Sequence, residues 1–494
     1  MLVLKHVPVR SFNENIAYIH KDCSIYKVSN IKSLTRIEIH GGEKPVFAFL
    51  QIADNNKIVR PDELGLNTEA FSQMGLPEGA EITLTLTPPA PSLSAVRRKI
   101  AGNVLSENDY AAIVNDISEH RYSNMDIASF LVAMNSFITP NEILDLAEAL
   151  RGDKIIDWGT EEIVADYHCI DDIPGNKIDL IITAIVAAYG LPMPKIVSSS
   201  SSSGSGILDT MKTLANVNID TRTLKKQVLE RRGAIVDAEK IEICEAERMI
   251  SKVEKQNGLS TLECSIASLL ANKMASGITH LLIDIPVGIR AKIKTSAEAT
   301  HLRKIIEYVG DRLGLNVDVT ITDGSEPIGS GVGPALEARD IIKILKNKED
   351  APDDLKEKAL FMAGRILEFD GKLRGGQGYL VAKELLKSGK AFDAFEMILK
   401  TQGKVEAPQL GHLTRDVVAD KDGTISRINT SFINKAATLA GAGQYAGAGI
   451  DIFRKSGESV TAGDILYRIY SCNQNDFAFV TSLIESGKTG FDIE

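Results

Sequence analysis

The chain lacks the features that mark several large classes of protein. Its five cysteines are scattered, odd in number and form no CxxC pair, so a disulfide framework is not expected and a reducing, cytoplasmic setting fits best. Positive charge is not in excess, because the formal net charge is −10 at pH 7. A clustered basic surface is the mark of nucleic-acid binding. We therefore predict no nucleic-acid partner.

Long hydrophobic runs are also missing. The longest, residues 178–191, is interrupted by Asp179 and is too short to span a bilayer. The N-terminal segment has no apolar core of the kind found in signal peptides. We therefore predict a cytoplasmic protein with no membrane partner. What the chain does have is length, because 494 residues with 44% hydrophobic content are enough for several cores.

The first third of the chain changes from a strand pattern to a helix pattern. Residues 1–86 contain short apolar or alternating runs separated by Gly, Pro and Asn turns, which predict a small β-rich module of barrel type. A Pro-rich stretch at 87–91 is typical of a stiff linker. Residues 92–150 then follow the helical period and predict a helical domain. Capping patterns predict three of its helix starts, at Ser106, Ser123 and Thr139.

The middle of the chain, residues 151–402, alternates strands with helices. Residues 281–285 and 317–321 are apolar runs typical of buried strands. Helices are predicted near 222–256, 260–276, 296–314, 334–347, 352–369 and 376–402. Alternation of this kind predicts a large α/β domain with a central sheet. We expect the helical domain at 92–150 to be joined by later helical segments.

The last part, residues 405–494, is β-rich again. A turn of the pattern G-x-x-V-x-x-G-D at 457–464 lies between two apolar strands and is typical of a barrel-sandwich hairpin. The predicted fold class is therefore multidomain α/β. It has an N-terminal small β module, a helical domain, a large α/β domain and a C-terminal α+β barrel-sandwich-like domain.

Two polar loops that lead into helices are the candidates for chemistry. The first spans 166–177, and the second spans 195–211 and contains a run of six serines at 198–203. Backbone N–H groups gather at helix starts, where the positive end of the helix dipole favours anions. On composition alone, a flexible linker is the favoured interpretation of the serine run.

Several motifs around these loops point to one family. The motifs lie at 96–100, 285–288, 291–294, 326–329, 332–339 and 375–378. They resemble the thymidine/pyrimidine-nucleoside phosphorylase family, and specifically its archaeal AMP phosphorylase branch, over nearly the whole chain. The resemblance implies a pentosyltransferase in which phosphate attacks the anomeric carbon of a nucleoside, or of a nucleoside 5′-monophosphate such as AMP. It also implies inorganic phosphate as co-substrate, no cofactor or metal, and a homodimer or larger homo-oligomer.

The first loop departs from the family pattern, which is Asp-Lys-His-Ser followed by a small residue and two glycines. His168 is kept, but Tyr167 stands in place of the lysine and Cys169 in place of the serine. Asp171 and Asp172 stand in place of the glycines. A carboxylate about 4 Å from a phosphate charge costs about 4 kcal/mol at an effective dielectric near 20. Phosphate binding is therefore expected to weaken unless these carboxylates turn away, take up protons or bind a cation.

The second loop departs as well. Val197, Ser199 and Ile207 stand where the family has Ser, Arg and Thr, and the position of the acid that protonates the leaving base is Ser260. The resemblance thus implies His168 and Ser260 as catalytic candidates. The implied substrate-binding candidates are Asp172, Ser198, Ser199, Ser200, Ser201, Ser202, Ser203, Ile207, Ser268 and Lys292.

Three possibilities stay open at this point. The leading prediction is the family's phosphorolysis carried out with altered loops. The second is a hydrolytic nucleosidase in which Asp171 or Asp172 acts as a general base toward water. The third is a catalytically inactive, nucleotide-binding paralogue. A cation held by His168, Asp171, Asp172 and Asp179 is a further alternative, since carboxylates suit Mg²⁺ or Ca²⁺; a solvated acidic loop is the simpler interpretation.

Overall fold

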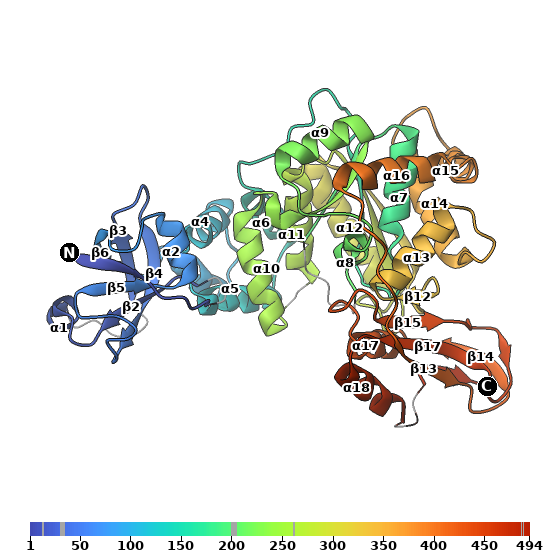
Figure 1. The fold of residues 1–494 in the computed structure, drawn as a ribbon. Helices are drawn as coiled ribbons and strands as arrows, with labels where there is room; N and C mark the ends of the chain where they lie inside the picture. Colours follow the sequence, from blue (N-terminus) through green and yellow to red (C-terminus); the bar gives the residue numbers. More distant parts are fainter. Residues whose placement is uncertain (12–13, 30–34, 199–204, 260–261, 486, 488) are drawn as a thin grey trace. The chain divides into compact units, whose positions relative to one another are not determined.

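The computed structural model describes all residues except 12–13, 30–34, 199–204, 260–261, 486 and 488. The chain forms two compact units, one of residues 1–152 with 244–272 and one of residues 153–243 with 273–494 (Figure 1). We call them unit 1 and unit 2. In the part of the chain that the structure describes, no helix is long and apolar enough to cross a membrane. The multidomain α/β fold class is confirmed.

Unit 1 begins with a closed β-barrel of strand order β1-β5-β2-β4-β3-β6. Its strands are β1 (Leu2–His6), β2 (Ile16–His20), β3 (Arg36–His40), β4 (Val46–Ala53), β5 (Glu63–Leu66) and β6 (Glu81–Leu86). Side chains alternate across a strand, and Ile37 and Ile39 accordingly point into the fully buried core while Glu38 does not. Two short helices accompany the barrel, α1 (Ser24–Ser29) and α2 (Thr68–Met74).

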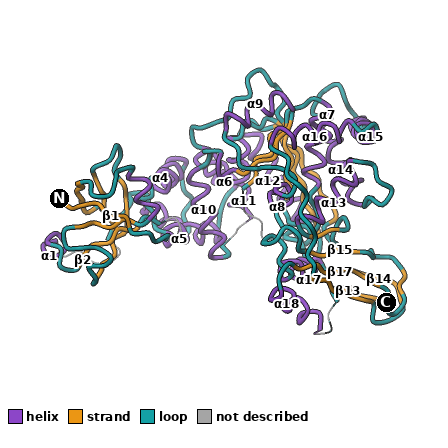
Figure 2. Tube along the Cα trace, in the orientation of Figure 1, coloured by secondary structure: helices purple, strands orange, loops and turns teal. Residues whose placement is uncertain are grey.

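The rest of unit 1 is helical. Its helices are α3 (Leu93–Ile100), α4 (Glu107–Ser118), α5 (Asn124–Ser136), α6 (Pro140–Arg151), α10 (Glu245–Asn257) and most of α11 (Leu262–Ala275). The three predicted helix starts are confirmed, because Ser106, Ser123 and Thr139 each form a reciprocal capping box with the acidic residue three positions later. Figure 2 shows this helical segment of the chain in purple.

Glu247 of α10 is a buried carboxyl group inside unit 1, with 6% exposure. Burial raises its pKa to about 7, against the opposing effects of a hydrogen bond with Asn272 and the charge of Lys255. The folded state therefore binds this proton more tightly than the unfolded chain does. The resulting stability is fully present below about pH 4.5 and is lost as the pH rises through about 7.

We expect Glu247→Gln to remove this pH dependence. At pH 8 the variant should be more stable than the wild type by about 3 kcal/mol, since one pKa unit corresponds to about 1.4 kcal/mol. At pH 5 the two proteins should differ little. Urea unfolding followed by circular dichroism at both pH values measures this. Glu78→Gln, at an exposed position of the same unit, is the control, and equal curves for wild type and Glu247→Gln at pH 8 would refute the prediction.

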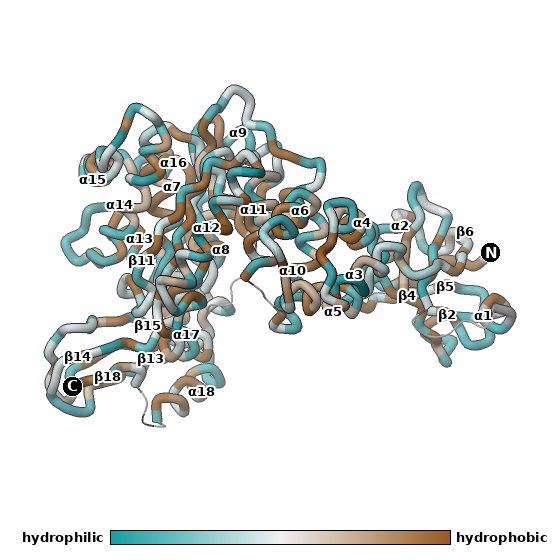
Figure 3. Tube along the Cα trace, turned by 180° about the vertical axis from the view of Figure 1, so that it is seen from behind, coloured by the Kyte–Doolittle hydropathy of each residue, from teal (hydrophilic) through white to brown (hydrophobic). Residues whose placement is uncertain are grey.

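Unit 2 contains two parallel sheets. Strands β7 (Ala165–Cys169), β10 (His280–Val287) and β11 (Asn316–Asp323) pair in the order β11-β10-β7, and β8 (Met193–Val197) pairs with β9 (Gly233–Asp237). The strands predicted at 281–285 and 317–321 are thus confirmed. Figure 3 shows hydrophobic residues along the strands at the centre of this unit. The parallel direction brings the carboxyl ends of each sheet's strands to one edge.

Helices surround these sheets. They are α7 (Ile178–Tyr189), α8 (Ile207–Lys212), α9 (Thr221–Arg231), α12 (Ser296–Arg312), α13 (Pro334–Leu345), α14 (Asp353–Leu367), α15 (Gln377–Lys387) and α16 (Lys390–Gln402), with a short 3₁₀ turn η1 (Ala238–Lys240). Helix α7 is hydrophobic all round, and the side chains of residues 178–186 are almost fully buried. It is therefore the central helix of the core of this unit.

Two helix predictions are wrong in detail. The single helix predicted over 222–256 is two helices, α9 and α10, because residues 233–237 form the fully buried strand β9 beside β8. The helix predicted over 376–402 is broken before Lys390, where Gly389 takes a left-handed conformation with φ of 80°. A glycine adopts that conformation at low cost, so it ends one helix and starts the next.

The C-terminal part of unit 2 has two small sheets, ordered β12-β15-β17-β13 and β16-β14-β18. Their strands are β12 (Gly331–Val332), β13 (Leu413–Val418), β14 (Gly423–Ile428), β15 (Gly449–Ile452), β16 (Ser459–Val460), β17 (Ile465–Ser471) and β18 (Phe491–Ile493), with helices α17 (Thr430–Leu439) and α18 (Gln474–Glu485). Strand β12 comes from the middle of the chain and pairs with β15. Next to it, Arg339 donates two hydrogen bonds to Asp451, over 2.6 and 2.7 Å.

Candidate functional site

The two loops predicted to carry chemistry, at 166–177 and 195–211, begin within the parallel strands β7 and β8 of unit 2. Residues 170–177 connect β7 to α7, and residues 288–295 follow β10. In open α/β sheets, ligands bind in the loops beyond the carboxyl ends of the strands. His168 lies near the end of β7 and Lys292 lies in the loop after β10. The neighbouring strands β7 and β10 thus present both residues at the same edge of the sheet.

Asp171 and Lys292 join these two loops. The backbone N–H of Lys292 donates to Oδ2 of Asp171 over 2.7 Å, and the N–H of Asp172 donates to Oδ1 over 2.9 Å. The exposed ammonium group of Lys292 also donates to the carbonyl oxygen of Ile170, over 3.2 Å. Both carboxylate oxygens of Asp171 are therefore hydrogen-bonded to loop backbone. These N–H donors stabilise the ionised form of Asp171 within the loops.

His168 is half-buried at the end of β7. Burial holds the pKa of its imidazole well below the usual range, and the positive charges of Lys273, Lys195 and Lys292 lower it further. His168 is therefore neutral near pH 7, with one nitrogen that donates and one that accepts a hydrogen bond. The effect of Lys292 also places that ammonium group within electrostatic reach of the imidazole.

Two residues that depart from the family pattern face the same buried carboxylate, Asp284 of β10. The hydroxyl of the fully buried Tyr167 donates to Oδ2 of Asp284 over 3.0 Å. The thiol of Cys169 lies 3.6 Å from that oxygen and donates to the carbonyl oxygen of Asp171 over 3.1 Å. Burial and the charge of Asp284 raise the pKa of both Tyr167 and Cys169. Both side chains therefore stay protonated and act as donors.

A buried charge network lies directly beneath the first loop. The ammonium nitrogen of Lys195 lies 2.6 Å from Oδ1 of Asp179 and 3.4 Å from Oδ1 of Asp166, and it donates to the carbonyl oxygen of Tyr167. Lys273 lies 2.5 Å from the other oxygen of Asp166. Burial alone would lower the pKa of Lys195, but the two carboxylates outweigh it and raise the pKa. Sequence analysis missed this network, although Asp179 within an apolar run was a signal.

Glu337 of α13 links the ends of both loops. Its carboxylate accepts hydrogen bonds from the hydroxyls of Ser205, over 2.9 Å, and Thr210, over 2.6 Å. The buried ammonium group of Lys177, which precedes α7, lies 3.5 Å from its other oxygen. The starts of α7 and α8 are thus fixed to the same carboxylate.

In the first loop, the backbone of Gly175 lies close to the backbone of Ile328, and the φ of Gly175 is 80°. A Cβ atom there would lie 2.0 Å from the carbonyl oxygen of Ile328. We expect Gly175→Ala to lower the free energy of unfolding of unit 2 by about 2–4 kcal/mol. Urea unfolding followed by the fluorescence of Trp158, the chain's one tryptophan, measures this. Gly371→Ala is the control, because a Cβ there meets no atom; equal losses in both variants would contradict the expectation.

The other predicted site residues have different locations. Asp172 is exposed in the first loop, Ser198 is half-buried after β8, and Ile207 is the first residue of α8. Ser268 lies in α11, in the part that belongs to unit 1. The remaining candidates lie outside the described residues, and they are Ser199, Ser200, Ser201, Ser202, Ser203 and Ser260.

The alternative of a bound cation does not fit the geometry. Asp179 is buried and ion-paired with Lys195, away from the exposed Asp172. In the ranges that the structure describes, no group of three or more His, Cys, Asp or Glu residues could hold a metal ion.

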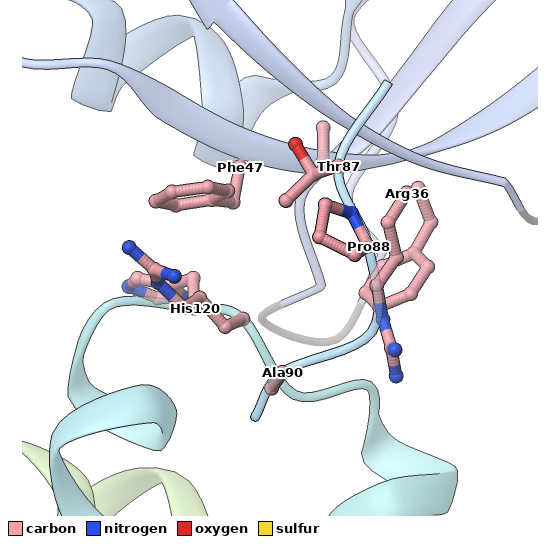
Figure 4. Close-up of a pocket in the computed structure, with 9 residues that line it drawn as sticks. Arg36, Phe47, Thr87, Pro88, Ala90 and His120 are labelled. Atoms are coloured by element: carbon pink, nitrogen blue, oxygen red, sulfur yellow. The ribbon is translucent and has the colours of Figure 1, made fainter. Parts of the chain in front are cut away.

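Unit 1 has a separate small hollow beside the linker after the barrel (Figure 4). Its cavity volume of about 10 Å³ is far below the 300–1,000 Å³ that is usual for ligand pockets. The guanidinium of Arg121 lies 4.5 Å from the ring centre of Phe47, and that of Arg36 lies 5.5 Å from the ring centre of Phe49. These cation–π contacts are interior packing. We therefore do not place a nucleoside there.

Comparison with known proteins decides the family. Sequence models match at residues 93–152 (Glycosyl transferase family, helical bundle domain) and at residues 424–487 (Pyrimidine nucleoside phosphorylase C-terminal domain). A protein of Methylococcus capsulatus named "Putative thymidine phosphorylase" is 40% identical over 495 residues, covering 100% of this chain and 96% of the relative. The chain belongs to the thymidine/pyrimidine nucleoside phosphorylase family. An Albidiferax ferrireducens protein of the same name is 39% identical and covers 97% of this chain and 92% of the relative.

A solved structure shares the fold of this nucleoside phosphorylase family member. It is the anthranilate phosphoribosyltransferase of Thermus thermophilus, with a TM-score of 0.52 and 18% sequence identity, covering 62% of this chain and 99% of that chain. At this identity the likeness concerns the fold alone. The sequence relatives, rather than this structure, confirm the family relationship predicted from the sequence motifs.

Proposed function

We propose that this family member is a pentosyltransferase that uses inorganic phosphate to split a nucleoside 5′-monophosphate such as AMP, or a nucleoside. The products are a free base and ribose 1,5-bisphosphate or ribose 1-phosphate. The observation that carries the proposal is the position of His168 at the end of β7 and of Lys292 in the loop after the neighbouring strand β10, in a chain whose relatives match along its whole length. The AMP-like preference rests on the N-terminal β-barrel and on the sequence Pro-Gly-Asn-Lys at 174–177, which resembles the archaeal AMP phosphorylase branch.

The reaction breaks the bond between C1′ and the base nitrogen and forms a bond between C1′ and a phosphate oxygen. The base leaves with a proton. Lys292 supplies positive charge toward the attacking phosphate or the sugar, where charge changes in the transition state. The neutral His168 donates a hydrogen bond to an oxygen of the same ligands. The acid role of Ser260, and the contacts of Asp172, Ile207, Ser268 and the serine run, remain part of this proposal.

Hydrolysis is less well supported than phosphorolysis. A general base must have a carboxylate oxygen free to take a proton from water. Both oxygens of Asp171 accept backbone hydrogen bonds. Asp171 is thus held within the loops, whereas Asp172 is exposed and stays the candidate base of this alternative.

We extend the proposal to location and assembly. None of the five cysteines, all of which lie in the described ranges, forms a disulfide, and this is typical of a reducing compartment such as the cytoplasm. Self-association as a homodimer or a larger homo-oligomer follows the family expectation. Size-exclusion chromatography with light scattering tests it.

The experiment is product analysis of AMP, CMP and thymidine with and without phosphate, preceded by calorimetric titration of phosphate and AMP. We expect base release that requires phosphate, together with a phosphorylated sugar product. Base release without phosphate would instead identify a hydrolase. Binding of AMP with no base release would identify an inactive paralogue.

A further inference from the structure

A second ammonium group, from a different element, contacts the residue of β10 that is paired with the last residue of β7. Lys358 of α14 lies with its nitrogen 2.9 Å from Oδ2 of Asp284 and donates to the hydroxyl of Thr322 over 3.4 Å. Its side chain is 11% exposed, whereas that of Asp284 is fully buried. The ammonium group therefore lies at the boundary between the buried carboxylate and the surface of unit 2.

The position of Asp284 defines where this ammonium group lies. Asp284 is paired in register with Cys169, the last residue of β7. The charge of Lys358 acts on Cys169 strongly enough to oppose the rise in the pKa of that thiol. Lys292 contacts the next residue of the same turn, Ile170, through its carbonyl oxygen. Two ammonium groups from separate elements thus flank the segment 168–171.

Asp284 does not need Lys358 to satisfy its hydrogen bonds. Its Oδ2 accepts from the hydroxyl of Tyr167 over 3.0 Å, and its Oδ1 accepts from the hydroxyl of Thr322 over 2.6 Å. A lysine is a flexible point charge with three donors, so its ammonium group can contact an anion and a carboxylate at once. The family pattern has a lysine at position 167. Here Tyr167 stands at that position, and its hydroxyl donates to Asp284.

We propose that Lys358 is a phosphate-binding residue, and that it supplies from α14 the positive charge that position 167 no longer carries. An oxygen of inorganic phosphate accepts a hydrogen bond from the ammonium group of Lys358 beside residues 168–171. The hydroxyls of Tyr167 and Thr322 continue to donate to Asp284. The inference rests on the proposed function for the identity of the anion. It adds a binding residue that the loop motifs do not contain.

The test measures phosphate binding by calorimetry and the KM for phosphate in four variants. Lys358→Met is expected to weaken phosphate binding about 30-fold and to change the KM for the nucleoside or nucleotide by less than about threefold. Lys358→Arg keeps the charge and is expected to stay within about fivefold of the wild type. Lys356→Met, on the same helix and paired with Asp353, is the matched control and should bind phosphate normally.

The double variant Lys358→Met with Asp284→Asn separates binding from folding. If Lys358 only neutralises Asp284, the double variant regains both stability and phosphate affinity, which overturns the inference. If Lys358 binds phosphate, the double variant regains stability and keeps the weak affinity. Phosphate binding without base release in the wild type would remove the proposed function but not the inference. Absence of phosphate binding in the wild type would remove both.

Discussion

Replacing Lys195 by methionine is expected to lower the free energy of unfolding of unit 2 by about 3–5 kcal/mol. The change leaves Asp179 buried without its cation and removes one of the two ammonium groups beside Asp166. An unpaired buried carboxylate has lost its hydration without gaining a partner, which is why such substitutions rank among the most destabilising. Urea unfolding at pH 7 measures the effect. Trp158 reports on unit 2 specifically, because it is buried there and donates to the carbonyl oxygen of Ser276 over 2.8 Å.

A double variant separates loss of charge pairing from loss of packing. Lys195→Met with Asp179→Asn removes both charges and should recover most of the stability lost in the single variant. Lys212→Met, at a half-exposed position of α8, should change the unfolding free energy by less than about 0.5 kcal/mol. A loss below about 1 kcal/mol in Lys195→Met would show that the network does not stabilise the unit.

Replacing Lys292 by methionine is expected to reduce kcat/KM for phosphorolysis about 100-fold, the range seen when one group that stabilises developing charge is removed. Lys292 is exposed and its ammonium group contacts only the carbonyl oxygen of Ile170 among the hydrogen bonds of its side chain that the structure describes. It is therefore available to a ligand. Its backbone N–H, which holds Asp171, is kept in the variant, so the loops should retain their arrangement.

Lys294→Met is the matched control for this substitution. Lys294 is exposed two positions along the same loop, and its backbone N–H donates to Glu298 over 3.0 Å. We expect normal kcat/KM in that variant and unchanged unfolding of unit 2 in both. Equal activity of Lys292→Met and the wild type would show that Lys292 has no role in turnover.

Local signals in the sequence located much of the fold. A capping box is formed by residues three positions apart, so Ser106 and Ser123 could be recognised without tertiary information. The strand residues 281–285 are apolar except for Asp284, and such a run is typical of a strand that is covered on both faces. Strand β9 was not predicted from the sequence, because its buried residues 233–237 are few and lie between helical segments rich in charge.

The charge partners of the site could not be read from spacing. Asp166 pairs with Lys273, which is 107 positions away, and Tyr167 bonds with Asp284, which is 117 positions away. Both pairs exist because parallel strands and a helix bring distant segments together. The sequence showed that Tyr167 replaced a lysine, but only the fold shows which carboxylate that tyrosine faces. For the same reason the sequence did not indicate a role for Lys358, because its helix α14 begins long after the two polar loops at 166–177 and 195–211.

Strand β12 lies in the middle of the sequence and pairs with β15, which is near its end. Val332 pairs with Ile450, and Arg339 holds Asp451. A second link joins Lys455 to Asp354 over 2.9 Å. A chain cut at residue 404 would expose β12 as an unpaired edge and remove Asp451, one of the two carboxylates that Arg339 contacts. Chimeras that exchange residues 405–494 between relatives should therefore carry residues 331–339 and Asp354 from the same parent, since these separated segments contact each other directly.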